Sequence, residues 1–244
     1  MAPDWRTGEE MLATDRHQPA RQVYRHGLQK KVNLVAGSKL RGVQQTESVL
    51  ESNIAAAAEI DPRVSWIETQ PVAFDLNTGR TYATKKIMVE QFAGTRYKPR
   101  AYTPDFRLRL DAGNEVYVEG KHTHLLEHAP ETLDALSAVR QFGHRIILMT
   151  EEDFPSTLVR NLRLLKTANP SPPTAAECKR LSAELRTPTP ASHLVENFGI
   201  STAVLFAWIR SGTLTCDLFE RPLGAQTSLT YGAGCLDHLE VLPL

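Results

Sequence analysis

The alternation of apolar and polar residues between positions 105 and 121 predicts two strands joined by a tight turn. Apolar residues at 106, 108 and 110 alternate with polar ones, which is the period of a strand with one buried face. Residues 111–114, Asp-Ala-Gly-Asn, favour a turn. On the return strand, valines at 116 and 118 face one way, whereas the side chains at 117, 119 and 121 face the other. The pattern therefore predicts a β-hairpin.

Three segments have the spacing of amphipathic helices. In residues 46–60 the apolar positions recur at i, i+4, i+7 and i+8, and the segment ends at Asp61-Pro62 because the residue before proline avoids the helical conformation. Residues 130–143 begin with proline and end with glycine, the usual order at the two ends of a helix. Residues 154–167 place leucines at 158, 162 and 165 on one face.

Other segments predict strands. Residues 64–74 and 81–92 are rich in β-branched and aromatic side chains. Residues 145–150 form a short apolar run, which is typical of a fully buried strand. The order strand, helix, buried strand between residues 115 and 150 predicts a crossover unit in a mixed sheet. The expected fold class is therefore α/β, with a mixed sheet flanked by helices.

The chain divides into three predicted parts. Residues 1–45 show weak periodicity and predict a basic, partly ordered arm, and residues 46–168 predict the main α/β domain. Residues 169–174, Asn-Pro-Ser-Pro-Pro-Thr, predict a linker at the start of a second domain, residues 169–244. In that domain, segments 192–197 and 202–211 have helix-turn-helix spacing, and residues 213–231 can supply a two-stranded wing. A small winged-helix-like C-terminal lobe is expected.

Composition excludes some classes of protein. The 244 residues are 41% hydrophobic, and no apolar run approaches the roughly 20 residues that a membrane span requires. The N-terminus lacks the apolar core of a signal peptide. The three cysteines are widely spaced, which argues against a disulfide framework and a cysteine zinc site. A cytoplasmic protein without membrane contact is expected.

Charge is unevenly distributed although the formal net charge is zero. Residues 16–41 contain seven Lys or Arg and no acid, and residues 80–109 contain eight Lys or Arg against two acids, whereas residues 111–153 contain nine acids. Clustered bases neutralise phosphates, although charged blocks are also common as solvated faces. The expected DNA contacts are Arg96, Lys98, Arg100, Arg107, Arg109 and His122.

The predicted hairpin carries a set of groups suited to phosphodiester hydrolysis. Asp105 and Glu119 are the expected carboxylate ligands of Mg²⁺, which prefers oxygen donors, and the carbonyl of Gly120 offers a third. Lys121 lies two residues beyond Glu119 on the same strand face, where its ammonium can orient water or stabilise phosphate charge. Glu51, beside the apolar stripe of the first helix, is the expected fourth member.

Each of these residues has an alternative interpretation. Glu119 and Lys121 can form an exposed ion pair that contributes little to stability. Asp105 follows a proline and can serve a turn. Glu51 stands three residues after Ser48, the spacing of a helix capping box. The ordered combination of all four favours the catalytic interpretation.

That order resembles a PD-(D/E)xK nuclease domain, with Pro104-Asp105 and Glu119-Gly120-Lys121 at the motif positions. More narrowly, residues 46–150 are similar to TnsA, the endonuclease subunit of heteromeric cut-and-paste transposases. The supporting segments are Glu47-Ser-Val-Leu-Glu51, Asp61-Pro-Arg-Val, Thr69-Gln-Pro71, Tyr102-Thr-Pro-Asp-Phe, Ile147-Leu-Met-Thr-Glu-Glu-Asp-Phe154 and Val159-Arg-Asn-Leu-Arg-Leu-Leu165.

The resemblance implies a restriction-endonuclease-like fold and a Mg²⁺-dependent enzyme, with Mn²⁺ as a substitute. Glu51, Asp105 and Lys121 would be catalytic, residue 119 would lie near the metal, and Glu51 would reach the metal through water. The enzyme would cut the 5′ ends of a transposon in double-stranded DNA. Its implied partners are a DDE-type transposase subunit and an ATPase regulator. The alternatives are a free-standing restriction or repair nuclease and a catalytically silent DNA-binding scaffold of this fold.

Two other features complete the sequence-based expectations. His122, His124 and His128 follow the motif and suggest a zinc site, but no nearby cysteine completes it, so they are expected to flank the cleft instead. Residues 190–244 contain only two Lys or Arg against five acids. Because a major-groove reader brings phosphate-binding bases, this C-terminal lobe is expected to contact protein, or simply to pack as a small domain.

Overall fold

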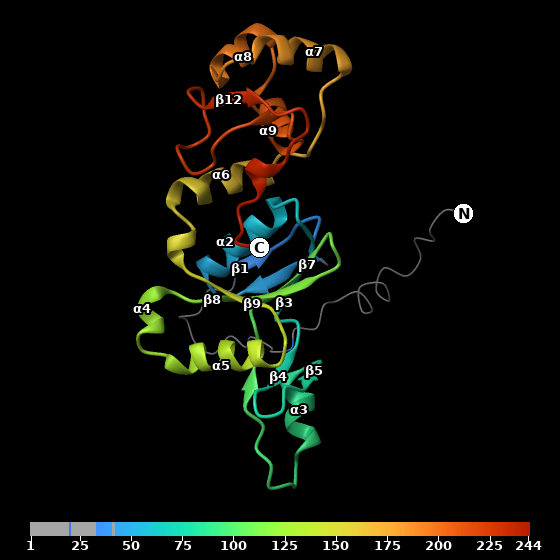
Figure 1. The fold of residues 1–244 in the computed structure, drawn as a ribbon, viewed down its shortest axis with the longest axis vertical. Coiled ribbons are helices and arrows are strands. Elements are labelled where there is room, and N and C mark those ends of the chain that lie inside the picture. The colour runs from blue at the N-terminus through green and yellow to red at the C-terminus, as the bar shows by residue number, and fades with distance from the viewer. Residues whose placement is uncertain (1–19, 21–32, 41) are drawn as a thin grey trace, which may run out of the picture. The chain divides into compact units, whose positions relative to one another are not determined.

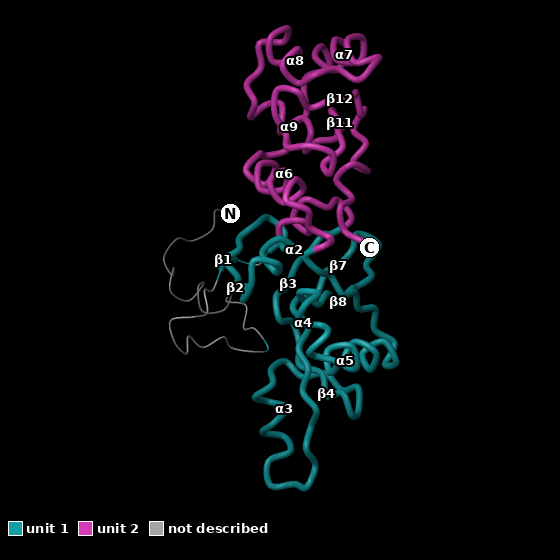
Figure 2. The backbone as a smooth tube through the Cα atoms, turned by 90° about the vertical axis from the view of Figure 1, so that its left-hand side faces the viewer, with its two compact units in different colours: residues 1–55, 64–151 teal, residues 56–63, 152–244 magenta. Residues whose placement is uncertain are grey.

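A computed structural model describes residue 20, residues 33–40 and residues 42–244 of a mixed α/β protein (Figure 1). The chain forms two compact units (Figure 2). Unit 1 comprises residues 1–55 and 64–151, and unit 2 comprises residues 56–63 and 152–244. The boundary between residues 151 and 152 precedes the predicted linker at 169–174, so the helix before that linker belongs to unit 2.

The main sheet of unit 1 has the strand order β3-β7-β8-β9. Its strands are β3 (Val64–Thr69), β7 (Phe106–Leu110), β8 (Glu115–Gly120) and β9 (Ile146–Met149). The first three are antiparallel, whereas β8 and β9 are parallel. The hairpin that the alternation pattern predicted is therefore confirmed, as is the mixed sheet that the order strand, helix, strand predicted. The prediction that 145–150 is fully buried is wrong for Ile147 and Leu148, which are only half-buried.

Helices α2 (Val49–Ile60) and α5 (Pro130–Gln141) lie on the two sides of this sheet in Figure 1. Helix α5 makes the predicted crossover between β8 and β9 and ends before Gly143, whose φ of 84° suits a residue without a side chain. Leu136 and Val139 of α5 pack with Tyr117 in a buried apolar cluster. The burial of this cluster holds α5 against one face of the sheet.

A smaller sheet of unit 1 has the order β5-β4-β6, formed by β4 (Ala73–Asp75), β5 (Thr81–Tyr82) and β6 (Ala101–Tyr102). The strand predicted over 81–92 is wrong beyond residue 82, because α3 (Lys85–Gln91) begins there. The side chain of Thr84 caps the helix by accepting the Ile87 N–H at 3.1 Å. This capping, together with the burial of Met88 against the small sheet, outweighs the β propensity of the segment.

The remaining elements of unit 1 include a second hairpin, β1 (Asn33–Val35) with β2 (Gln44–Thr46). It lies in the region predicted to be a partly ordered arm, of which residues 1–19, 21–32 and 41 fall outside the described residues. The predicted helix start at Thr46 is wrong, because Thr46 ends β2 and α2 begins at Val49. A short helix, α4 (Thr123–Leu126), follows β8, and a 3-10 turn, η1 (Glu151–Asp153), follows β9.

Unit 2 contains α6 (Ser156–Lys166), α7 (Ala175–Glu184), α8 (Ala191–Phe198) and α9 (Thr202–Arg210). Its sheet has the order β10-β12-β11, formed by β10 (Thr189–Pro190), β11 (Leu214–Thr215) and β12 (Ser228–Tyr231), and the 3-10 turn η2 (Asp237–Leu239) follows. The helix pair and the paired strands predicted after residue 190 are confirmed. In the described part of the chain, no helix has the length and apolarity needed to cross a membrane.

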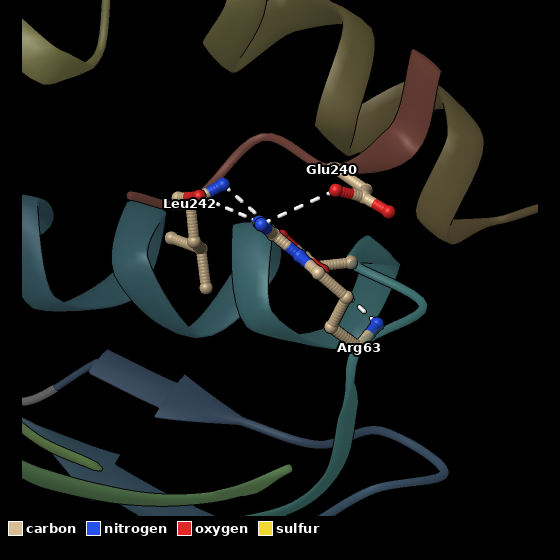
Figure 3. A network of polar contacts seen from close by, with 4 residues as sticks. Arg63, Glu240 and Leu242 are labelled. Carbon is tan, nitrogen blue, oxygen red and sulfur yellow. Dashed lines mark hydrogen bonds and ion pairs between the residues drawn. The ribbon is translucent and has the colours of Figure 1, made fainter. Parts of the chain in front are cut away.

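A buried carboxylate anchors the C-terminal segment inside unit 2 (Figure 3). Asp61 is fully buried and accepts Arg63 Nε at 2.9 Å and Nη2 at 2.7 Å, a two-pronged pairing that also raises the pKa of Arg63. Asp61 Oδ2 further accepts the Leu242 N–H at 3.1 Å, while Arg63 Nη2 donates to the Leu242 carbonyl at 2.6 Å. Residues 61 and 63 thus satisfy both backbone groups of Leu242.

We expect Asp61→Ala to lower the free energy of unfolding by about 2 to 3 kcal/mol, because it leaves Arg63 and the Leu242 N–H without their acceptor. Glu240→Gln is the control. Its carboxylate lies 3.2 Å from Arg63 Nη1 but is 38% exposed, so its loss costs under about 1 kcal/mol. Urea unfolding measures both variants, and equal losses would contradict the anchoring role of Asp61.

Candidate active site

A cleft of about 470 Å³ in unit 1 brings the predicted catalytic residues together. Its lining includes Glu51 from α2, Asp105 from the start of β7, Glu119 and Gly120 from β8, and Lys121 just beyond it. The pairing of β7 with β8 and the packing of α2 on the sheet place these residues together although 70 positions separate the first from the last. All five sequence-predicted residues therefore share one concave surface.

Asp105 connects the strands around the cleft. Its Oδ2 accepts the Gly120 N–H at 2.8 Å, and its backbone carbonyl accepts the Gln70 N–H at 2.7 Å. The side chain of Asp105 thus reaches across to the next strand. A carboxylate held by a backbone donor has a defined direction, which a metal ligand needs.

Gly120 is required by the approach of α2. A Cβ at this position would lie 2.8 Å from Ile54 Cδ1, closer than carbon atoms pack, and 3.6 Å from Asp105 Oδ2. The absence of a side chain lets the helix that carries Glu51 lie against the strand that carries Glu119.

Glu119 is oriented by a tyrosine that the sequence analysis did not assign to the site. The Tyr102 hydroxyl donates to Glu119 Oε2 at 2.7 Å. Burial and the neighbouring negative charge of Glu119 raise the pKa of Tyr102 far above its ordinary value, so the phenol remains a neutral donor. Tyr102 thus fixes Oε2 of the Glu119 carboxylate, and the other neighbours of Glu119 determine where Oε1 points.

Lys121 extends the strand hydrogen bonding past the end of β8. Its backbone N–H donates to the Met149 carbonyl at 2.9 Å, which keeps the chain extended for one more residue. The side chain is half-buried and lines the same cleft as Glu119, as the two-residue spacing predicts. An ammonium group in a cleft rich in carboxylates can bind phosphate or water.

Glu51 has two roles in the geometry. Its Oε1 accepts the Ser48 hydroxyl at 2.9 Å and its Oε2 accepts the Glu47 N–H at 2.7 Å, while the Glu51 N–H donates to Ser48 Oγ at 3.0 Å. The bond from the Glu51 N–H to Ser48 Oγ is one half of the predicted capping box, whereas the carboxylate accepts the Glu47 N–H and the Ser48 hydroxyl. Glu51 also lies in the lining of the cleft.

Gln70 is a cleft residue whose role the sequence pattern did not reveal. Its backbone has a φ of 44°, in the left-handed region that costs a residue with a side chain about 1 to 3 kcal/mol. Its Nε2 donates to Glu47 Oε1 at 3.1 Å, while its buried Oε1 has no hydrogen-bond partner among the described residues. The following Pro71 gave no signal for this conformation, because a residue before proline favours an extended backbone.

The donor set fits a hard divalent cation. Mg²⁺ binds oxygen ligands and commonly uses one or two carboxylates, retaining water at other positions. The cleft offers the carboxylates of Asp105 and Glu119, and the unpartnered amide oxygen of Gln70 is a further acceptor in the same lining. An orphaned buried acceptor is costly unless water or a cation satisfies it, which supports such an occupant here.

The predicted DNA contacts fall into two groups. Arg96, Lys98 and Arg100 are exposed on the segment between α3 and β6, and Arg100 lines the cleft together with Lys85 of α3, which the sequence analysis did not single out. Arg107 and Arg109 form ion pairs within the sheet instead. His122 lies beside Glu151 rather than in the cleft lining.

The charge of Arg107 is used within the sheet. Its guanidinium bonds to Glu68 of β3 and lies 3.6 Å from Glu115, while Arg109 lies 3.5 Å from the same Glu115. Burial alone would lower the pKa of Arg107, but the Glu68 hydrogen bond and charge raise it. Phosphate contact by Arg107 or Arg109 remains a prediction. Such a contact would compete with the ion pairs to Glu68 and Glu115.

The chain matches no known protein family, and no curated protein matches it.

We expect Gly120→Ala to destabilise the protein by about 1 to 3 kcal/mol, since its methyl group would overlap Ile54 Cδ1 and push α2 away. The matched test is Ile54→Val, which removes that atom and by itself costs about 1 kcal/mol. In the Ile54→Val background, Gly120→Ala should cost less than it does alone. A double-mutant cycle in urea measures the coupling, and strictly additive losses would contradict the proposed contact.

Proposed function

We propose that this protein is a Mg²⁺-dependent DNA endonuclease of the PD-(D/E)xK class. The observation that carries the proposal is that one cleft of unit 1 contains Asp105, Glu119, Gly120 and Lys121 in the order and spacing of that motif, together with Glu51 from the preceding helix. The same carboxylates, together with the Gln70 amide oxygen, offer the oxygen donors that a hard cation prefers.

The topology of unit 1 supports a restriction-endonuclease-like fold. An antiparallel trio, β3-β7-β8, is extended by the parallel strand β9 through the crossover helix α5, and α2 lies on the other face. Placement of the motif residues at the ends of β7 and β8 agrees with that assignment. The order β10-β12-β11 and the pair α8 and α9 support a winged-helix-like C-terminal lobe.

The residues of the cleft have distinct chemical tasks in this proposal. Asp105, Glu119 and the Gly120 carbonyl would hold Mg²⁺ or Mn²⁺, with Glu51 reaching it through water. The ion would supply charge stabilisation on the phosphate and acidify a bound water. Lys121 orients the attacking water or offsets negative charge on the phosphate oxygens. Tyr102 and the Gly120 N–H keep the two carboxylates in position.

The specific role that we propose is cleavage of the 5′ ends of a transposon in the cytoplasm, as a TnsA-type subunit of a heteromeric transposase. A DDE-type transposase subunit and an ATPase regulator are the proposed partners. This part of the proposal derives from the resemblance of the motif segments in order along the chain. A free-standing restriction or repair nuclease is the alternative for the same site.

The few bases of residues 190–244 argue against DNA reading by the helix-turn-helix segment. Within residues 190–244 the two Lys or Arg residues are both engaged by the protein. Arg210 Nη1 donates to the carbonyls of Leu165 and Ala168 at 3.2 and 3.1 Å, and burial lowers its pKa. Arg221 bonds to Glu220 at 2.6 Å. A lobe without free bases in its helix-turn-helix segment lacks the usual phosphate contacts.

The apolar character of α9 is explained by packing within unit 2. Leu205, Trp208 and Ile209 are buried, and only Val204 among its large apolar residues is markedly exposed. This helix therefore contributes to the core of unit 2. The exposed residues of α9 lie in its first turn, at 202–204.

The nuclease activity is tested with supercoiled plasmid, Mg²⁺ and the purified full chain, with and without a transposase partner. We expect Asp105→Asn and Lys121→Ala each to reduce strand cleavage by about 100-fold or more, since each removes a group that acts on the reacting phosphate. Lys179→Ala is the control, because Lys179 is an exposed lysine of α7 in unit 2. Cleavage at the control rate by either cleft variant would contradict the assignment.

The same assay separates the related alternatives. Strong nicking without a partner would favour the free-standing nuclease. DNA binding with no cleavage under any condition would favour the silent scaffold.

DNA affinity tests the basic residues separately from cleavage. We expect Arg100→Ala to weaken binding to every duplex sequence alike and to reduce the slope of log affinity against log salt by about 1, because a phosphate contact releases one counterion. Arg107→Gln should leave that slope unchanged, since Glu68 already pairs with this side chain. Filter binding or fluorescence anisotropy over a salt series gives both slopes, and a larger effect of Arg107→Gln would reverse the assignment.

A further inference from the structure

A second set of metal-ligand side chains lies at the edge of the main sheet, outside the cleft lining. His122, His124 and Glu151 each offer one ligand atom, and these three atoms lie within 4.8 Å of one another. The parallel pairing of β8 with β9 explains why these three residues lie together. Gly120 is the register partner of Met149, so the residues that follow the two strands leave the sheet at the same edge. The third ligand, Glu151, was not predicted from the sequence, because it lies 27 residues after His124 along the chain.

The carboxylate of Glu151 is held in place by its neighbours. The Thr123 hydroxyl donates to Glu151 Oε1 at 2.6 Å, and the Thr123 N–H donates to Oε2 at 3.0 Å. The Thr123 hydroxyl is the largest cause that lowers the pKa of Glu151 to about 2, so the group is charged at neutral pH. Support of a ligand by surrounding hydrogen bonds is typical of metal sites, where it sets ligand direction.

The two imidazoles lie on the open side of this carboxylate. His122 Nδ1 is 3.2 Å from Glu151 Oε2, and the ring centroids of His122 and His124 are 5.7 Å apart. His124 is exposed and His122 is half-buried, so solvent and ions can reach the group. The third histidine, His128, is different: its Nδ1 lies 3.0 Å from the His124 carbonyl, and it is not a member of the cluster.

We propose that His122, His124 and Glu151 form a binding site for a divalent transition-metal ion of the zinc class, separate from the Mg²⁺ cleft. Two imidazole nitrogens and one carboxylate suit zinc, cobalt or nickel, whereas Mg²⁺ prefers all-oxygen sets. Three protein ligands leave a coordination position for water. The ion would tie the segment directly after Lys121 to the segment directly after β9, which secures the end of the strand that carries the motif.

A simpler role for Glu151 is capping of α4. That helix has His122 at its N-cap position without a side-chain cap bond, and the Thr123 N–H that Glu151 accepts is one of its free donors. Capping requires neither imidazole, and it predicts no metal affinity. Metal binding that depends on His124 therefore distinguishes the two roles.

The test is a Co²⁺ titration of the untagged full-length chain at neutral pH, in the presence of excess Mg²⁺, followed by visible absorption. We expect one equivalent to produce the d–d bands of nitrogen- and oxygen-bound cobalt, and Zn²⁺ to displace them. His124→Ala should weaken Co²⁺ binding at least tenfold. Because His124 is exposed, the variant should keep its fold, and circular dichroism checks this. His128→Ala is the matched control and should bind like the wild type.

Asp105→Asn separates this site from the cleft. If Asp105→Asn abolishes the cobalt bands, or if His124→Ala retains them at full affinity, the proposal is overturned. Absence of cobalt binding by the wild type overturns it as well. A second measurement, the rise in Tm on addition of Zn²⁺, should be present in wild type and His128→Ala and lost in His124→Ala. Neither readout depends on DNA cleavage, so failure of the nuclease proposal would leave this one standing, and the reverse also holds.

Discussion

The hydrogen bond from the Gly120 N–H to Asp105 Oδ2 is the interaction on which the candidate active site depends. It joins the residue before β7 to the last residue of β8 at the point where the two strands end. At the same position Ile54 of α2 lies where a side chain would be, since a Cβ at 120 would come within 2.8 Å of Ile54 Cδ1. One short contact region therefore sets the direction of Asp105, the end of the strand with Glu119, and the approach of the helix with Glu51.

Around this point the protein supports its acidic groups with neutral donors. Tyr102 donates to Glu119, and Ser48 donates to Glu51. Such donors orient carboxylates without cancelling their charge, unlike the ion pair of Glu68 with Arg107 on the same sheet. That ion pair uses an acid for the stability of the sheet. Unit 2 follows the second pattern, with Asp61 and Arg63 committed to the C-terminal segment.

Local pattern was informative where one face of an element is buried and the other is not. The alternation at 106–110 and 115–120 and the helix signals at 130 and 143 agree with β7, β8 and α5. It failed at 81–92, where β-branched residues suggested a strand but a threonine cap and a buried methionine favour α3. It also failed to anticipate the strained backbone of Gln70, because a left-handed φ arises from contacts made elsewhere in the fold.

The sequence by itself determined the hairpin, the crossover and the residue types offered to the chemistry, since these follow from periodicities of two and 3.6 and from spacing along one strand. Tertiary structure alone decided which distant groups meet. Glu51 comes to the cleft through the packing of α2 at Gly120, and Gln70 through its bond to Asp105. Glu151 reaches His122 through the parallel register of β9. Contacts between segments far apart in the chain depend on burial and register, which no local pattern contains.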